Sequence, residues 1–135
     1  MNRNNLLMQL ADKVLEENPR FLFNVSGDIP ASYNGQISAL GVSVAMNGLC
    51  ATLATYYKGS NNDTRAVDRR PILEVIARMI HADSIVNSAF PQITNAESLM
   101  RTAIRLEPAK QKVLQKEIIE CAVALKQVIR TYNLV

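Results

Sequence analysis

The sequence predicts an all-α fold, a compact single-domain bundle of about five helices that covers residues 1–135. Two observations favour this class. Apolar residues make up 48% of the chain but aromatic residues only 5%, and this balance of Ala, Leu, Ile, Val and Met favours helices over a sheet. Several segments also repeat apolar residues at intervals of three and four, which is the period of an amphipathic helix. A chain of 135 residues can bury one core without metal or disulfide support.

Three helices are predicted in the N-terminal half of the chain. The first ends just before Pro19, because proline cannot continue a helix. The second carries Gly41 on its apolar face, which indicates close approach by another backbone. Asn47 and Gly48 mark a turn that leads into the third, and Gly59 is a typical C-terminal stop. The predicted bounds are about 4–17, 32–46 and 49–58.

Two further helices are predicted at about 69–82 and 95–132. Asp68 is expected to cap the first of them, with Pro71 in its opening turn. Thr94 and Glu97 have the spacing of a capping box at the start of the second. Pro108 is expected to break or bend this long helix. From their central places in the apolar faces, we expect five side chains to be buried: Leu53, Ile76, Met79, Ile118 and Leu125.

No pattern typical of catalysis, of a metal site or of a cofactor site is present in the sequence. His81 is the only histidine, which excludes a site built from several histidines, and no glycine-rich phosphate-binding loop occurs. Cys50 and Cys121 stand among apolar helical residues and are expected to be reduced core thiols. We therefore predict a protein that is not an enzyme, holds no cofactor or metal, and takes no small-molecule substrate.

The sequence also lacks features that would direct it to a membrane. No window is long and apolar enough to span a bilayer, and the N-terminal segment turns acidic instead of forming the apolar core of a signal peptide. We therefore expect a cytoplasmic protein without a membrane partner.

Positive charge gathers at the C-terminal end of the chain. Residues 1–57 hold three basic and four acidic groups, whereas 101–135 hold seven basic and three acidic groups. In the last predicted helix, apolar residues repeat at intervals of four and three and form one seam. Four basic residues lie on the face opposite that seam: Lys112, Lys116, Lys126 and Arg130. Arg101 and Arg105 extend the same row if the helix continues unbroken through Pro108.

A row of this kind can follow the phosphates of a nucleic acid without reading its sequence. It can equally be the solvated face that any amphipathic helix places opposite its core, and Ile119 and Val123 interrupt it at its middle. A second basic cluster, at the polar loop and the start of the fourth helix, consists of Arg65, Arg69 and Arg70. Arg70 has the i, i+4 spacing for an ion pair with Glu74.

Three segments resemble the small helical subunit of type III-B (Cmr) CRISPR RNA-guided effector complexes. They are "YNGQISALGVSVAMNGLCATLATYYKGS", then "RRPILEVIARMI" after the polar loop, and the ending "LMRTAIRL…EIIECAVALKQVIRTYN". The shared features are a tyrosine-led helix, a "GL" with small residues that leads to an aromatic residue and a lysine, and an Ile/Leu-rich helix. The resemblance covers about Tyr33 to Asn133.

The resemblance implies a non-catalytic subunit that acts in antiviral defence. Copies of it would stack along the assembly, with apolar surfaces against neighbouring subunits and basic residues against the backbone of the guide RNA and the target RNA. RNA cleavage would belong to other subunits. The alternative is a helical adaptor for protein–protein interaction with no nucleic-acid role, which salt-sensitive RNA binding would exclude.

Overall fold

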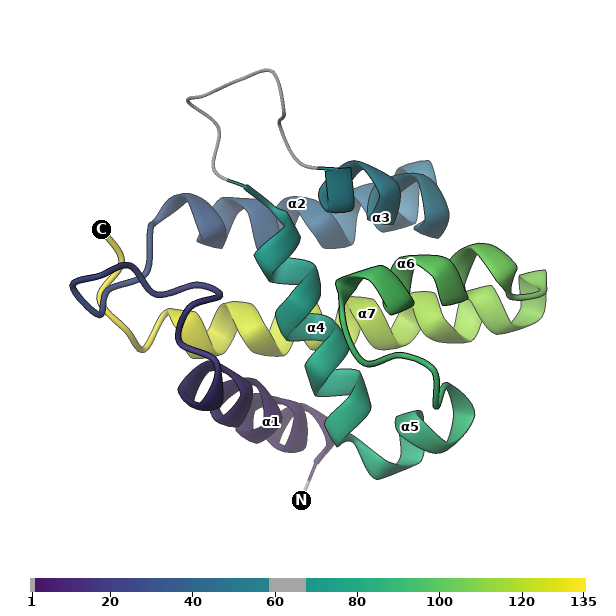
Figure 1. Cartoon of the computed structure of the whole chain (residues 1–135), viewed down its shortest axis with the longest axis horizontal. Coiled ribbons are helices and arrows are strands. Elements are labelled where there is room, and N and C mark those ends of the chain that lie inside the picture. Colours follow the sequence, from purple (N-terminus) through teal and green to yellow (C-terminus); the bar gives the residue numbers. More distant parts are fainter. Residues whose placement is uncertain (1, 59–67) are drawn as a thin grey trace.

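A computed structural model describes residues 2–58 and 68–135, and the secondary structure of these residues is helical (Figure 1). Their helices are α1 (Arg3–Glu17), α2 (Ser32–Asn47), α3 (Leu49–Lys58), α4 (Arg70–Ala82), α5 (Ser84–Ala89), α6 (Ala96–Arg105) and α7 (Pro108–Ile129). The only β-type pairing in these ranges is one isolated bridge between Ile29 and Leu134. The predicted all-α class is therefore confirmed, whereas the predicted number of about five helices is too low.

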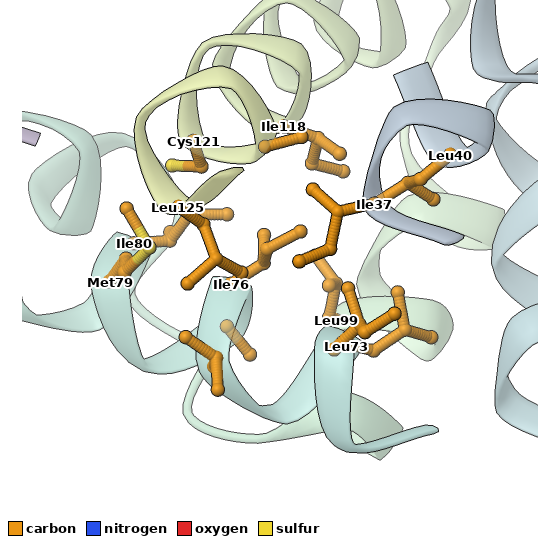
Figure 2. Close-up of a cluster of buried hydrophobic side chains, with 14 of the residues drawn as sticks. Ile37, Leu40, Leu73, Ile76, Met79, Ile80, Leu99, Ile118, Cys121 and Leu125 are labelled. Atoms are coloured by element: carbon orange, nitrogen blue, oxygen red, sulfur yellow. The ribbon is translucent and has the colours of Figure 1, made fainter. Parts of the chain in front are cut away.

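The core forms where α4 crosses α7 (Figure 1). α4 also contacts α1, α3, α5 and α6, while α7 packs mainly against α1 and α2. Figure 2 shows Ile76 and Met79 of α4 directed at Ile118 and Leu125 of α7, and all four side chains have no exposed surface. Leu53 is equally buried, so the five predicted core positions are confirmed. Burial of side chains of this size contributes about 1.5–3 kcal/mol each.

The predicted last helix is two helices, because the chain turns back ahead of Pro108. Leu106 and Glu107 are both extended, with ψ angles of 148° and 158°, and α7 begins at Pro108 itself. Proline disfavours the helical conformation in the residue before it and suits the first helical turn, where its missing N–H is not needed. α6 and α7 therefore run in opposite directions (Figure 1). α7 ends at Ile129, three residues before the predicted end at 132.

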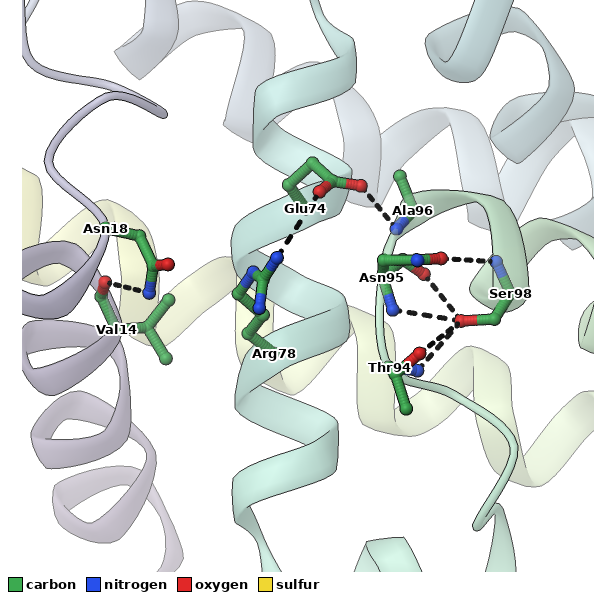
Figure 3. A network of polar contacts seen from close by, with 8 residues as sticks. All are labelled: Val14, Asn18, Glu74, Arg78, Thr94, Asn95, Ala96 and Ser98. Carbon is green, nitrogen blue, oxygen red and sulfur yellow. Dashed lines mark hydrogen bonds and ion pairs between the residues drawn. The ribbon is translucent and has the colours of Figure 1, made fainter.

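Two local predictions about helix starts are corrected. The capping box of α6 consists of Asn95 and Ser98, not of Thr94 and Glu97 (Figure 3). The Ser98 hydroxyl accepts the backbone N–H groups of both Thr94 and Asn95, at 2.8 and 2.9 Å. At α4 the capping position is Arg69, although Asp68 does accept the backbone N–H of Arg70 at 3.0 Å.

The joint between α2 and α3 depends on one glycine. Gly48 has a φ angle of 90°, which side-chain-bearing residues rarely adopt, as expected for the turn at this position. Gly41 behaves differently from the expectation. A Cβ atom at Gly41 would meet no atom of the described residues within 4 Å, so none of their backbone approaches it closely and that prediction is wrong. The predicted stop at Gly59 lies outside the described residues.

Candidate nucleic-acid interface

The basic residues predicted to form a row lie on the outward side of α7 and, for Arg130, at its C-cap. Lys112, Lys116 and Arg130 are exposed, and Lys126 is half-buried. At 100° per residue, Lys112 and Arg130 point roughly 120–180° away from the α7 residues that pack on α4. At 1.5 Å per residue, the row from Lys112 to Arg130 is about 27 Å long. The row faces away from α4.

The acidic side chains of α7 that accompany this row are held by Arg3, at the start of α1. The Arg3 guanidinium donates to Glu117 Oε2 at 2.6 Å, and its Nε atom lies 3.5 Å from Glu120. A further nitrogen donates to Asp83 Oδ2 at 2.6 Å, and the Asp83 side chain is only 3% exposed. One arginine thus joins α1, the α4–α5 junction and α7.

The same contacts further stabilise the charged form of the Arg3 guanidinium. Partial burial acts to lower the pKa of the guanidinium, but the hydrogen bonds to Asp83 and Glu117 outweigh it, and the pKa is raised. Sequence reasoning did not find this residue, because its two hydrogen-bonded partners are 80 and 114 positions away along the chain. No local spacing indicates pairs at such separations.

Because Arg3 engages both carboxylates, the row has no acidic partner of its own among the residues that the structure describes. Within the described ranges, none of the four basic side chains of the row lies within 4.0 Å of a carboxylate. Lys116 and Glu120 have the i, i+4 spacing of an ion pair, yet the pair that forms is Arg3 with Glu120. The positive charge of the row is therefore available to an anionic partner.

Apolar side chains divide the row into two halves. Ile119 is partly buried and Val123 is 49% exposed, and both lie between Lys116 and Lys126 on the outward side of α7. They line a groove of about 250 Å³ between α1 and α7. The row is therefore two pairs of charges, Lys112 with Lys116 and Lys126 with Arg130.

Arg69 and Arg70 are stacked on the tyrosines at the end of α3. The Arg69 guanidinium lies 4.9 Å from the centre of the Tyr56 ring, and that of Arg70 lies 4.2 Å from the centre of the Tyr57 ring. Arg70 Nε also donates to the Tyr57 carbonyl at 2.8 Å. Stacking fixes the plane of a guanidinium and leaves its edge free to bind phosphate.

The expected ion pair between Arg70 and Glu74 does not form. Glu74 instead accepts the backbone N–H of Ala96 at 2.5 Å and lies 3.9 Å from Arg78 (Figure 3). The contact with Ala96 satisfies an N–H group at the start of α6, where helices leave such groups unpaired. Arg65, the third member of this cluster, lies outside the described residues.

Arg101 and Arg105 lie on α6 and do not extend the row on α7, because the helix breaks between them and Lys112. Both are exposed and line a groove of about 670 Å³. The predicted binding residues that the structure describes are thus distributed over three places: α7 with its C-cap, the start of α4, and α6.

Other kinds of site find little support in the residues that the structure describes. No three or more His, Cys, Asp or Glu side chains there are grouped so that they could hold a metal ion. Cys121 is buried, and burial raises the pKa of its thiol, with the nearby Glu117 carboxylate adding to the effect. None of the helices in 2–58 and 68–135 has the length and apolar character needed to cross a membrane.

By its fold and its exposed basic helix faces, the chain is a small all-helical protein with surfaces suited to binding. A family model described as CRISPR-associated protein (Cas_Cmr5) matches residues 8–132. The chain therefore belongs to the Cas_Cmr5 family, which makes it a Cmr (type III-B) CRISPR-associated small subunit. Membership implies association with other subunits of the Cmr effector complex. No curated protein and no solved structure matches the chain significantly.

Proposed function

We propose that the chain is a non-catalytic subunit of the cytoplasmic type III-B effector complex and that its α7 row binds the backbone of guide and target RNA in antiviral defence. The observation that carries this proposal is the engagement of Glu117 and Glu120 by Arg3. Without Arg3, Glu120 would be free to pair with Lys116 at i, i+4, and the negative charge of Glu117 would not be compensated. With Arg3 in place, four cations stand along one helix face without an acidic partner in the described chain.

Such a row suits the backbone of RNA better than its bases. Lysine presents a compact charge on a flexible stem and binds phosphate without fixed geometry. Contacts of this kind position a nucleic acid but carry no sequence information. A subunit that must accept any guide and any target needs this property. Each phosphate contact with a single strand adds about 0.7 to the salt-dependence slope of binding.

One chain offers few phosphate contacts, and we propose that copies of it, stacked along the complex, supply the rest. Linking several weak sites raises the overall affinity through effective concentration. Apolar, uncharged surface for contact with neighbouring subunits is present on α2 and α3. No charged residue occurs between Ile29 and Tyr57, and Val42 and Met46 of α2 are 59% and 79% exposed.

The same uncharged surface supports the alternative, a helical adaptor that binds only proteins. The two functions differ in their response to salt. If the α7 row binds phosphates, RNA binding by the assembled complex weakens steeply as salt rises, and a complex without this subunit shows a smaller slope. An identical slope with and without the subunit would favour the adaptor. Filter binding of labelled target RNA at several salt concentrations measures both.

A further inference from the structure

The groove on α6 lies outside the α7 row and has a composition of its own. α6 buries Leu99, Met100 and Ala103 in the core. Its other side carries polar residues at helical spacing, and these form one wall of the groove of about 670 Å³. The complete lining consists of Gln92, Asn95, Glu97, Ser98, Arg101, Thr102, Arg105 and Leu106.

Two of these residues have a structural role. Asn95 and Ser98 form the capping box of α6, with the Asn95 side-chain oxygen accepting the Ser98 backbone N–H at 2.8 Å (Figure 3). The capping box fixes the first turn of the helix and thereby the position of the arginines that follow.

The remaining hydrogen-bonding side chains of the groove are not used within the protein. Among the described residues, Gln92, Arg101, Thr102 and Arg105 form no side-chain hydrogen bond, and neither arginine has a carboxylate within 4.0 Å. Two arginines elsewhere in these ranges are, by contrast, engaged by carboxylates: Arg3 by three of them and Arg78 by Glu74. The α6 groove thus gathers donors that have no partner within 2–58 and 68–135.

We propose that the α6 groove binds one phosphorylated nucleotide unit of a single-stranded RNA. Arg101 and Arg105 are at i, i+4, which places their Cβ atoms about 5–6 Å apart and lets both guanidinium groups reach one phosphate. The Gln92 amide and the Thr102 hydroxyl supply a donor and acceptor pair for the sugar and the base edge. The volume lies in the range of about 300–1,000 Å³ that small-ligand sites occupy.

The single-stranded form follows from the need to place a base in the groove. An unpaired RNA strand can turn a base out of its stack, whereas a duplex presents mainly phosphates and 2′-hydroxyls. The inference takes RNA as the partner from the proposed function. It differs in residues and in ligand form, because the α7 row requires only a backbone.

The test is a titration of the isotopically labelled full chain followed by NMR. The ligands are single-stranded hexauridylate, uridine 5′-monophosphate, inorganic phosphate, uridine and hexaglutamate. Hexauridylate should shift the amide signals of Gln92, Ser98 and Thr102 most strongly, the monophosphate and phosphate more weakly, and uridine and hexaglutamate not at all. An equal affinity for the monophosphate would assign the groove to free nucleotides and contradict an RNA strand. Equal shifts with hexaglutamate would assign it to acidic proteins.

Charge-matched variants separate the groove from general electrostatics. Arg101→Gln with Arg105→Gln should weaken hexauridylate binding by at least about tenfold, because two charge-assisted hydrogen bonds are lost. Lys13→Gln with Arg20→Gln removes the same charge far from α6 and should change the affinity by less than about twofold. An equal loss in both variants would overturn the groove as the site.

Glu97 provides a test in the opposite direction. Glu97→Gln removes the only carboxylate that lines the groove in the described structure and should strengthen binding about twofold, whereas Glu16→Gln should not. If hexauridylate shifted only the amide signals on the outward side of α7, the α6 groove would be excluded as a binding site, whereas the proposal for the α7 row would stand. The proposal for the α7 row is tested separately, in the assembled complex with Arg101 and Arg105 retained. It would be contradicted if replacement of the row residues left RNA binding by that complex unchanged.

Discussion

Arg3 and Glu117 are 114 positions apart in the sequence, yet the Nη2 atom of one lies 2.6 Å from the Oε2 atom of the other. The same guanidinium contacts Asp83 at the α4–α5 junction, where the Asp83 side chain also accepts the Ile85 N–H at 3.2 Å. Three segments of the chain therefore meet at one side chain. This contact stabilises the fold and also determines which charges α7 presents to its surroundings.

Replacement of Arg3 by Gln should destabilise the protein. The change leaves the buried Asp83 carboxylate without its charged partner. In a fully buried ion pair, loss of one partner lowers the free energy of unfolding by about 3–5 kcal/mol. Because the Arg3 side chain is 34% exposed, we expect a smaller loss of about 1–3 kcal/mol in the free energy of unfolding. Urea denaturation measures it. Lys13→Gln, which breaks the exposed pair with Glu17, should cost less than about 0.5 kcal/mol, and an equal loss in both variants would contradict the role of Arg3.

Arg3→Gln should also weaken RNA binding by the reconstituted complex, although Arg3 is not part of the row. Glu120 becomes free to pair with Lys116, and Glu117 loses its cationic partner, so α7 carries more uncompensated negative charge. The triple variant that adds Glu117→Gln and Glu120→Gln should recover binding. If binding stays weak in the triple variant, the loss comes from misfolding and not from the released carboxylates. Filter binding at moderate salt gives the three affinities.

Truncation of the core where α4 meets α7 should be costly. Ile76→Ala and Leu125→Ala each remove a side chain with no exposed surface, and each should lower the free energy of unfolding by about 2–5 kcal/mol. Val42→Ala on the outward side of α2 is the control and should change stability by less than about 0.5 kcal/mol. If chemical denaturation showed that the two core variants lose as little free energy of unfolding as the control, α4 would not pack on α7 as described.

Cys121 should be unreactive in the native protein and should make stability fall at high pH. Burial raises the pKa of its thiol, whereas the unfolded thiol ionises near about pH 8.5. Its contribution is fully present below that pH and is lost above it, at up to about 1.4 kcal/mol per pH unit, because only the unfolded state releases the proton. Cys121→Ala should reduce this decline. A thiol reagent that modifies Cys121 in the folded protein as fast as in urea would contradict its burial.

The apolar patterns of α4 and α7 could be predicted because each is visible within its own segment. The break at Pro108 was predicted for the same reason, since proline acts on its immediate neighbours. α5 was missed because its six residues are too few to show a period. The Asn95–Ser98 capping box was misplaced by one residue, since Thr94 and Asn95 are both acceptable caps and only the geometry of the Ser98 hydroxyl selects between them.

The charged contacts were harder to predict than the core. Arg70 stacks on Tyr57 instead of pairing with Glu74, because the tertiary contact between α3 and α4 outweighs a weak i, i+4 preference. Arg3 gave no signal at all, since its partners come from distant segments. The basic row itself could be predicted from helical spacing alone, but its lack of acidic partners in the described part of the chain depends on Arg3.

Reversal of the row tests the central proposal most directly. The variant exchanges the four residues of the row for Glu: Lys112, Lys116, Lys126 and Arg130, the last at the C-cap of α7. Its circular dichroism should remain helical, because none of them is a core residue. In the reconstituted complex it should weaken target-RNA binding across unrelated sequences, and the salt-dependence slope should fall by about 3. A control complex carrying Lys13→Glu and Arg20→Glu should bind as the wild type does. Wild-type affinity and slope in the reversed complex would show that the row on α7 is only a solvated face.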